Sequence, residues 1–212
     1  MSAPLDFLAA GARSILGRSL EDRELAAFGK YLDLLHKWQK VHRLVGSAEP
    51  GWIVENLFLD SLLFLRVLPA DVGSLADLGS GAGFPGIPIK IVRPDLDVVL
   101  IESRERRVSF LSAALRELAL DRVRVVGGRV ETLQTEMVGL FGAVVMRCAG
   151  DQNKLRPAAE RLLAPGGTVI LSGPPARTPL DWGEWVEVPG IKSGRTRLFI
   201  VYRTGPRPPG SV

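Results

Sequence analysis

The residues best suited to chemistry in this sequence are a glycine-rich loop and two acids. The stretch LADLGSGAGFPGIP, residues 75–88, carries four glycines directly after a short apolar run. Because glycine has no Cβ, the backbone around Gly79 and Gly81 can lie very close to a bound molecule. Asp77 ends the apolar run, and Glu102 ends the next one, about 20 residues further on, where an acid is well placed to accept hydrogen bonds from two ribose hydroxyls. These positions predict a binding site for a ligand that contains a nucleoside.

Two nucleoside cofactors are compatible with the loop. Starting at Gly81 the residues follow the pattern G-x-G-x-x-G, the fingerprint of dinucleotide binding. That register begins two residues late, however, and puts Phe84 and Pro85 where the pyrophosphate should lie. The glycines begin directly at the strand end with Gly79, and no second mononucleotide-binding half is evident. The pattern therefore favours S-adenosylmethionine, which needs no phosphate cradle, over a nicotinamide dinucleotide; a tight turn without a ligand is the third interpretation.

The elements that must position these residues alternate between strand and helix. Strands are expected at residues 74–78, 98–102, 123–126, 143–147, 168–172 and 196–203, with a short one near 185–188, and helices near 86–92, 104–118, 130–137 and 153–163. This alternation predicts a doubly wound, mostly parallel α/β sheet. The carboxyl ends of its strands would bring the glycine loop and both acids to one crevice.

The first part of the chain has a purely helical pattern. Apolar residues such as Leu25 and Phe28 recur at helical spacing, and Ser19, shortly before two acids, is expected to cap this helix. A further helix is expected at about residues 50–66, where Asp60 would order the junction with the sheet. The sequence thus predicts an N-terminal helical cap.

Three segments follow from this pattern: a cap over residues 1–68, a core over 69–203, and a tail over 204–212. The tail is rich in proline and glycine and is expected to be disordered. At 212 residues, with 46% hydrophobic and 24% charged residues, the chain suits one medium domain with a small appendage.

The cysteine content, the N-terminus and the apolar stretches indicate the cellular compartment. Cys148 is the only cysteine, so no intrachain disulfide can form, and the N-terminus lacks the pattern of a signal peptide. The longest apolar stretch, residues 57–68, contains Asp60 and Arg66 and is too short and too charged to span a bilayer. We therefore expect a cytoplasmic protein without a membrane partner. The net charge of +4 is compatible with a nucleic-acid partner.

Three segments together resemble a known family. They are LLHKWQKVHRL, LFLDSL and LADLGSGAGFPGIPIKIVRPDLDVVLIESRERRVSFL, and the resemblance runs from about Tyr31 to Arg147, then more weakly to the neighbourhood of Tyr202. The sequence is similar to the bacterial glucose-inhibited division protein B family, whose members methylate guanine N7 in 16S ribosomal RNA. The resemblance implies a Rossmann-like class I methyltransferase, S-adenosylmethionine as cofactor, and 16S ribosomal RNA or the small ribosomal subunit as partner. A monomer is expected.

The resemblance also implies roles for single residues. The expected cofactor-binding set is Asp77, from its place at the strand end, together with the positions matched to the family: Gly79, Gly81, Phe84, Glu102, Ser103, Val130, Glu131 and Arg147. Glu102 would hold the ribose hydroxyls, with Ser103 beside it, and the pair Val130 and Glu131 would contact the adenine. Arg147, at the end of a strand, would lie beside both the cofactor and the target base, and it is the candidate catalytic residue.

The absence of other catalytic motifs is consistent with this chemistry. Guanine N7 has a free lone pair and a sulfonium methyl group is already activated, so alignment supplies most of the acceleration and no strong base is required. His36 and His42 have no acid or cysteine at metal-ligand spacing, so no metal is expected.

The substrate side departs from the family pattern at several positions. Polar family residues are replaced around Arg43 and at Asn56, Leu57, Ser172 and Leu198. These changes bear on which base is methylated rather than on the fold or the cofactor. Another RNA or a small molecule as substrate, a nicotinamide-dependent oxidoreductase, and an RNA-binding relative without turnover remain alternatives.

Two basic clusters have no role in this scheme. One lies at Arg104, Arg106 and Arg107, and the other runs from Lys37 to Arg43. Either could contact RNA phosphates or form a solvated helix face.

Overall fold

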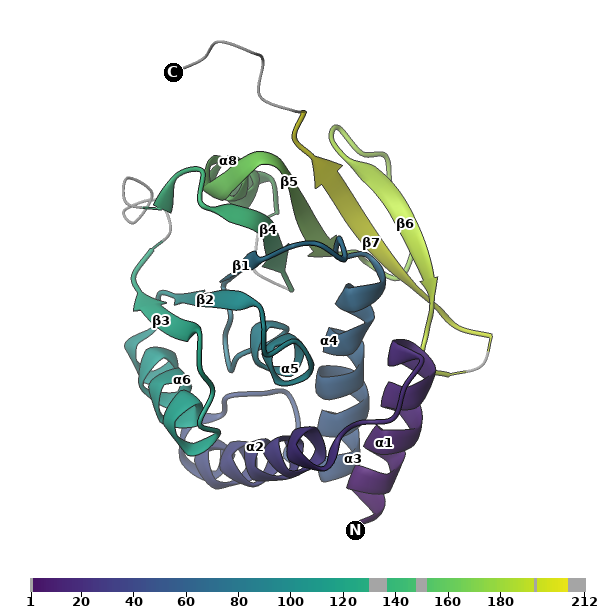
Figure 1. Cartoon of the computed structure of the whole chain (residues 1–212), viewed down its shortest axis with the longest axis vertical. Helices are drawn as coiled ribbons and strands as arrows, with labels where there is room; N and C mark the ends of the chain where they lie inside the picture. Colours follow the sequence, from purple (N-terminus) through teal and green to yellow (C-terminus); the bar gives the residue numbers. More distant parts are fainter. Residues whose placement is uncertain (1, 130–136, 148–151, 193, 206–212) are drawn as a thin grey trace.

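A seven-stranded sheet forms the centre of the computed structural model, which describes residues 2–129, 137–147, 152–192 and 194–205 (Figure 1). The strands are β1 (Ser74–Leu78), β2 (Asp97–Glu102), β3 (Val123–Gly127), β4 (Phe141–Met146), β5 (Leu163–Ser172), β6 (Glu184–Pro189) and β7 (Thr196–Arg203). Their order is β3-β2-β1-β4-β5-β7-β6. The pairs among β1 to β5 are parallel, and β7 is antiparallel to both β5 and β6. The predicted mostly parallel sheet is confirmed.

Helices cover both faces of this sheet (Figure 1). One face is packed by α1 (Ala3–Leu16), α2 (Asp22–His42), α5 (Gly86–Val92) and α6 (Glu105–Glu117), and the other by α8 (Gln152–Leu162). Along β1, Leu75 belongs to the first buried cluster, whereas Ala76 and Leu78 belong to the second. This alternation is what a strand buried on both sides requires, and it confirms the doubly wound architecture. The helix predicted at 130–137 lies almost wholly outside the described residues.

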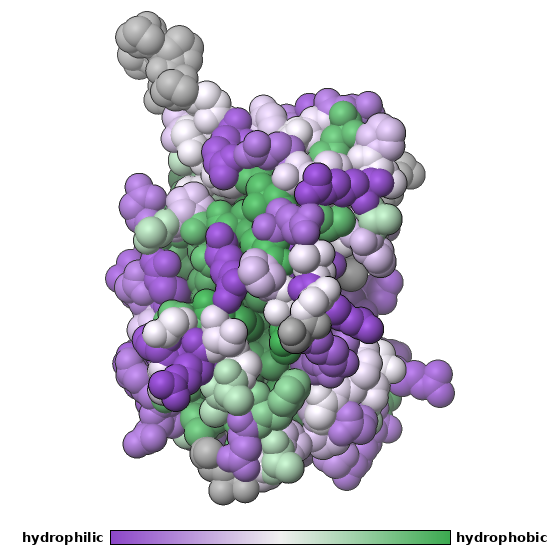
Figure 2. Space-filling view, turned by 90° about the vertical axis from the view of Figure 1, so that its right-hand side faces the viewer, coloured by the Kyte–Doolittle hydropathy of each residue, from purple (hydrophilic) through white to green (hydrophobic). Residues whose placement is uncertain are grey.

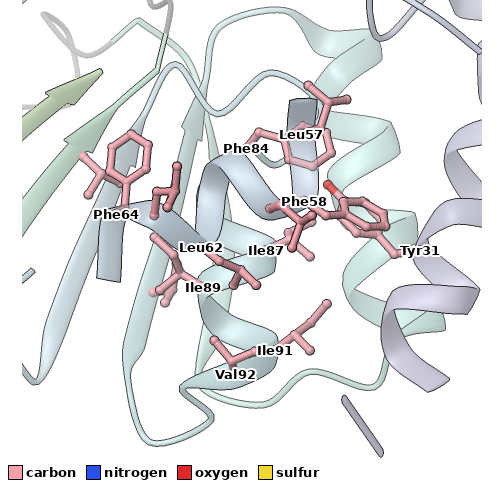
Figure 3. Packing of buried hydrophobic residues seen from close by; sticks show 14 of the residues in the cluster. Tyr31, Leu57, Phe58, Leu62, Phe64, Phe84, Ile87, Ile89, Ile91 and Val92 are labelled. Atoms are coloured by element: carbon pink, nitrogen blue, oxygen red, sulfur yellow. The ribbon is translucent and has the colours of Figure 1, made fainter. Parts of the chain in front are cut away.

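The N-terminal helices share their core with the sheet rather than forming one of their own. Tyr31 of α2 stacks on Phe58 and on Phe84, with ring centroids 5.3 and 5.4 Å apart, and Ile87 of α5 lies beside them (Figure 3). All four belong to the same buried cluster as Leu100 of β2. The boundary predicted at residue 68 is therefore crossed by one continuous core, and the division into cap and core remains a prediction.

Helix α2 starts later than the sequence predicted. Its N-cap is Glu21, which forms a reciprocal capping box with Glu24, so the prediction of Ser19 was wrong. The physical reason is that Glu24 binds the backbone at Glu21 rather than at Ser19. Glu24 is almost fully buried, accepts the Glu21 N–H, and accepts two hydrogen bonds of 2.7 Å from Arg18. This charge-assisted pair fixes the start of the helix.

The helix expected at 50–66 is continuous in extent but not uniform. It consists of α3 (Pro50–Ile53), the π-helical turn η1 (Val54–Leu59), α4 (Asp60–Leu62) and the 3₁₀ turn η2 (Leu63–Arg66). Insertion of a π turn into an α-helix is a frequent feature of functional sites. Here it precedes Asp60 and contains Asn56, both of which contact Arg147 after β4.

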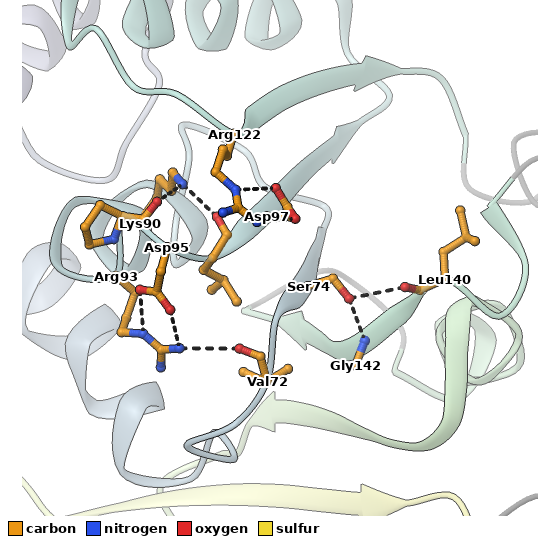
Figure 4. A network of polar contacts seen from close by, with 11 residues as sticks. Val72, Ser74, Lys90, Arg93, Asp95, Asp97, Arg122, Leu140 and Gly142 are labelled. Atoms are coloured by element: carbon orange, nitrogen blue, oxygen red, sulfur yellow. Dashed lines mark hydrogen bonds and ion pairs between the residues drawn. The ribbon is translucent and has the colours of Figure 1, made fainter.

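A polar network ties together the amino-terminal ends of the strands (Figure 4). Arg122 pairs with Asp97 through two hydrogen bonds of 2.9 and 2.7 Å. The buried Lys90 ammonium donates to the carbonyls of Pro94 and Leu96, at 2.8 and 2.6 Å, and burial lowers its pKa. These contacts close turns at the end of the sheet opposite the glycine loop, so we assign them a structural role.

The outer surface mixes polar and apolar residues. The face on the side of β6, β7 and α1 shows a band of hydrophobic residues between hydrophilic ones (Figure 2). Phe7 of α1 is 42% exposed. Within the described residues, no helix is both long and apolar enough to cross a membrane. Thr204, the first residue of the predicted tail, donates its N–H to the carbonyl of Gly167, and residues 206–212 lie outside the described part.

Candidate active site

The glycine loop is fixed onto the end of β2. It runs from Gly79 to Pro85, between β1 and α5, as predicted. The N–H groups of Gly79 and Ser80 both donate to the carbonyl of Ile101, at 2.9 and 3.1 Å. The Ser80 hydroxyl donates to the carbonyl of Asp77 at 2.8 Å. Three of its glycines have positive φ, with values of 75° at Gly79, 61° at Gly81 and 93° at Gly83.

The glycines of the loop serve two different purposes. A Cβ added at Gly81 would meet nothing nearer than the Arg107 guanidinium, at 3.5 Å, so this backbone has an open side. A Cβ at Gly83 would lie 2.4 Å from Ile87 and 2.8 Å from the Tyr31 hydroxyl, and one at Gly86 would lie 2.4 Å from Leu100. Gly83 and Gly86 are therefore needed for packing of the loop and α5, whereas Gly81 leaves room for a ligand.

Asp77 is a fully buried carboxyl group at the end of β1. Its Oδ2 accepts the Gly86 N–H at 2.8 Å, and its Oδ1 has no hydrogen-bond partner among the described residues. Burial raises the pKa of Asp77 to about 7, against the opposing effects of the Gly86 N–H and the Arg147 charge. A buried carboxylate oxygen without a donor is unusual, and it marks a place where a cationic or hydrogen-bonding group of a ligand would be stabilised.

Glu102 lies directly against the loop, as the sequence predicted. Its Oε2 accepts the Gly81 N–H and its Oε1 accepts the Arg104 N–H, both at 2.9 Å. The Arg107 guanidinium lies 3.6 Å from Oε2. An ionised carboxylate has about four lone-pair sites, so these contacts leave acceptor capacity for hydroxyl donors. Ser103, the next residue, is exposed beside it.

Phe84 is brought to the site but faces the core. Its ring is 5% exposed and packs against Tyr31, while the guanidinium of Arg147 lies over the ring, 5.8 Å from its centre. The Tyr31 hydroxyl donates to the carbonyl of Ala82, which anchors the loop to α2. Only a small edge of the Phe84 ring is exposed, so little of it is available for the predicted contact with the cofactor. The other predicted pair, Val130 and Glu131, lies outside the described residues.

Arg147 follows the end of β4 and is held in place by the helical segment before β1. Its Nε donates to Asp60 Oδ2 at 3.1 Å, and its Nη2 donates to the carbonyl of Asn56 at 2.6 Å. The other oxygen of Asp60 forms an ion pair of 2.9 Å with Arg197, whose Nη1 donates to the carbonyl of Gly173. One carboxylate thus bridges the arginine that follows β4 and an arginine of β7.

This bridge borders a cleft with a volume of about 480 Å³. The residues lining it are Trp52, Glu55, Asn56, Asp60, Leu63, Arg147, Pro175, Gly190, Ile191, Lys192, Arg195, Thr196 and Arg197. Sequence reasoning gave Asp60 only a role in ordering the junction and did not propose Arg197 as a site residue. Among the positions that depart from the family pattern, Asn56 lines the cleft, whereas Leu57, Ser172 and Leu198 are buried.

Comparisons with known proteins identify the family. The GidB family model, described as rRNA small subunit methyltransferase G, matches residues 24–173. A ribosomal RNA small subunit methyltransferase G from Xanthomonas campestris is 33% identical over 210 residues, which cover 94% of this chain and 97% of that protein. The protein of the same name from Nitrosospira multiformis is 40% identical over 71% of this chain and 68% of its own length. The one from Halorhodospira halophila is 38% identical over 66% of this chain, which spans 65% of that protein.

Solved structures support the fold alone. A SAM dependent methyltransferase from Aquifex aeolicus superposes with a TM-score of 0.52 at 17% identity, covering 73% of this chain and 93% of that one. A precorrin-6y C5,15-methyltransferase from Geobacter metallireducens gives a TM-score of 0.52 at 15% identity, covering 76% and 90%. The predicted Rossmann-like class I methyltransferase fold is confirmed.

The predictions of family, of methyltransferase activity on small-subunit ribosomal RNA, and of S-adenosylmethionine as cofactor are confirmed together. The nicotinamide interpretation of the Gly81 register is wrong, because the same loop belongs to a methyltransferase core. The chain belongs to the rRNA small subunit methyltransferase G family.

Proposed function

We propose that the protein methylates N7 of a guanine in 16S ribosomal RNA, with the cofactor against the glycine loop and the target base in the cleft beside Arg147. The observation that carries this proposal is the position of both sites along the carboxyl ends of β1, β2 and β4, where open α/β sheets bind their ligands. The proposal includes a cytoplasmic location, where 16S ribosomal RNA is found, and a monomeric protein.

The residues around the loop suit S-adenosylmethionine. Glu102 offers acceptor oxygens to ribose hydroxyls, and Gly81 has the open backbone that a close ligand requires. Asp77 Oδ1 is a buried acceptor that lacks a donor among the described residues, and an ammonium group such as that of the methionine part would complete it. When bound, the cofactor supplies a methyl group on a positively charged sulfur, which is already activated for displacement.

Arg147 is suited to orient a guanine without acting as a base. It uses its Nε and one Nη2 hydrogen to hold its own position, so further N–H donors remain on the guanidinium. Arginine is the commonest side chain to recognise the O6 and N7 edge of guanine. A donor to O6 would orient the base while N7 keeps its lone pair for the methyl group. No proton leaves N7 in this reaction, so the residues of the cleft need only hold and orient the base.

Asp60 moderates the charge of the cleft. Transfer of a methyl group to N7 leaves the guanine ring positively charged, and Arg147 and Arg197 would repel it. Asp60 lies between them and contacts both, at 3.1 and 2.9 Å, so it offsets part of this repulsion. Aromatic side chains stack on unpaired RNA bases, and Trp52, 36% exposed at the cleft, is available for that contact.

A transfer assay tests the proposal. Small subunits and naked 16S ribosomal RNA from a strain that lacks the gene would be incubated with the protein and methyl-labelled S-adenosylmethionine, and the modified nucleotide mapped. We expect one labelled guanine with the methyl group at N7, and transfer that is slower by about a hundredfold or more in Arg147→Ala. Label on a different base, or RNA binding without label, would refute the proposal.

A further inference from the structure

Two basic segments that are far apart in the sequence border one hollow. Helix α6 lies beside α2 in the fold (Figure 1), and the hollow between the end of α2 and the start of α6 has a volume of about 370 Å³. The residues lining it are His42, Arg43, Leu44, Arg104, Glu105, Arg106 and Arg107. Two of them contact Glu102 of the cofactor site, Arg104 through its backbone N–H and Arg107 through its guanidinium, and the others have no role in the methyl-transfer site described above.

The walls of this hollow are fixed by packing. Trp38, one turn before the end of α2, meets Phe110 of α6 edge-on with ring centroids 5.5 Å apart, and it also contacts His42. Leu44 is buried in the main core. Arg43 lies between His42, the last residue of α2, and Leu44, and its backbone is left-handed with φ of 41°. The arginines therefore project from a rigid turn and a rigid helix.

The charges of the hollow are largely uncompensated. In the described part of the structure, the guanidinium groups of Arg43, Arg104 and Arg106 have no hydrogen-bond or ion-pair partner, and all three are exposed. Glu105 is the one acid among the lining residues. Helix α6, 13 residues long, has no side-chain cap, and the N–H groups of Glu105 and Arg106 have no hydrogen-bond partner among the described residues. Its dipole adds positive potential at the same place.

This arrangement suits an anion with several acceptor oxygens. Converging guanidinium groups repel one another unless an anion lies between them, and arginine binds phosphate oxygens in bidentate geometry. The hollow also adjoins the cofactor loop, because the Arg107 guanidinium lies 3.5 Å from the position that a Cβ on Gly81 would occupy. The loop follows β1, which lies between β2 and β4 in the sheet, so an RNA strand whose base enters the Arg147 cleft after β4 could extend past the loop to the hollow after β2.

We propose that the hollow between α2 and α6 binds a phosphate of the RNA backbone and thereby orients the strand on the enzyme. This inference rests on the proposed function for the identity of the RNA, but RNA binding can be measured without turnover. It assigns a positioning role to Arg43 and Arg106, whose side chains reach neither the glycine loop nor the Arg147 cleft.

The test compares Arg43→Asn/Arg106→Gln with the native protein in binding to naked 16S ribosomal RNA at several salt concentrations. Asparagine tolerates the left-handed backbone at position 43, so this substitution removes charge without adding strain. We expect RNA affinity to fall roughly tenfold at about 0.1 M salt, and the salt dependence to become shallower by about one released counterion. Affinity for S-adenosylhomocysteine, measured by calorimetry, should stay within about twofold.

Two further variants serve as controls. Arg116→Gln removes one charge from the other end of α6, about 15 Å away, and should leave RNA affinity nearly unchanged. Arg43→Lys/Arg106→Lys keeps the charge but loses the bidentate geometry, so its RNA affinity should lie between those of the native and the charge-removing proteins, with the native salt dependence. Equal RNA affinity and salt dependence in the native and charge-removing proteins would overturn the inference, and so would a parallel loss of cofactor affinity, which would assign the hollow to the cofactor. If the native protein binds RNA in this way but transfers no methyl group, the proposed function fails and this inference stands.

Discussion

The cofactor loop and the arginine cleft occupy the same edge of the sheet but are built by different means. The loop is held by backbone N–H groups that donate to two buried carboxylates, Asp77 and Glu102, over separations of 9 and 21 residues. The cleft is held by charged side chains from distant elements: Arg147 contacts Asp60 and Asn56, 87 and 91 residues away. The loop depends on glycines, which lack side chains, whereas the cleft depends on contacts between side chains of distant elements.

This difference has a consequence for tolerance to change. A loop built from backbone permits almost no added atoms, because any Cβ collides or strains it. A cleft built from side chains can exchange one residue for another and keep its shape. None of the departures from the family pattern expected from the sequence falls on the loop: Asn56 lines the cleft, Arg43 lines the hollow between α2 and α6, and Leu57, Ser172 and Leu198 are buried.

The largest expected effect concerns the pH dependence of stability at Asp77. Its folded-state pKa is about 7, whereas the unfolded value is about 3.9. Because the folded state favours the protonated form, the contribution of Asp77 to stability is fully present below about pH 4 and is lost as the pH rises through 7. The loss amounts to about 4 kcal/mol. Urea unfolding of the native protein and of Asp77→Asn between pH 4 and 8 measures it.

The difference between the two proteins isolates this one group. The amide that Asp77→Asn introduces cannot ionise, so the free energy of unfolding of the variant should rise relative to the native protein as the pH increases. A constant difference across this range would mean that Asp77 stays ionised, and the buried-carboxylate description of the loop would be wrong.

The next effect distinguishes the glycine that packing requires, Gly83, from the glycine that leaves room for a ligand, Gly81. Gly83→Ala forces a Cβ into Ile87 and the Tyr31 hydroxyl, and we expect it to lower the free energy of unfolding by about 3 kcal/mol. Gly81→Ala has room for its Cβ and bears only the cost of positive φ, about 1 kcal/mol. The same Cβ would occupy the open side of the loop, so Gly81→Ala should lose cofactor affinity while remaining folded. Chemical denaturation and calorimetry check both; equal destabilisation by the two variants would contradict the assignment.

The smallest effect concerns the bridge in the cleft. Asp60→Asn removes the charge that joins Arg147 to Arg197, and we expect kcat to fall about tenfold with cofactor affinity unchanged. RNA affinity should stay the same or rise, because two positive charges are freed. Asp97→Asn is the matched control, since it makes the same change in the ion pair with Arg122 at the opposite end of the sheet and should leave kcat unchanged. A loss of RNA affinity equal to the loss of kcat would show that Asp60 does not act through Arg147.

The cofactor loop was far easier to predict from the sequence than the arginine cleft. The strand at 74–78, the glycine loop and Glu102 were predictable because glycine density and the position of an acid depend on local spacing. The same reasoning found Gly83 and Gly86 without explaining them, since their need for packing comes from Tyr31 and Leu100. Phe84 was assigned to the cofactor, but its burial in an aromatic cluster follows from long-range contacts.

The cleft was out of reach for the same physical reason. Asp60 bridges Arg147 and Arg197, and nothing in the local spacing of these three residues indicates that they meet. The cap of α2 was misassigned to Ser19 because the choice of Glu21 depends on the buried pair of Arg18 and Glu24. Polar and apolar periodicity predicts elements, whereas ion pairs between elements require the fold.

The most direct test of this account is a calorimetric titration of S-adenosylhomocysteine into Glu102→Gln and Arg147→Gln, with methyl transfer to 16S ribosomal RNA measured on the same samples. Glu102→Gln should bind the cofactor product about 10- to 100-fold more weakly, since it loses charge-assisted hydrogen bonds. Arg147→Gln should bind it within about twofold of the native protein and yet transfer almost no methyl group. If Arg147→Gln instead loses cofactor affinity as severely as Glu102→Gln does, the separation between a backbone-built cofactor site and a side-chain-built substrate cleft is contradicted.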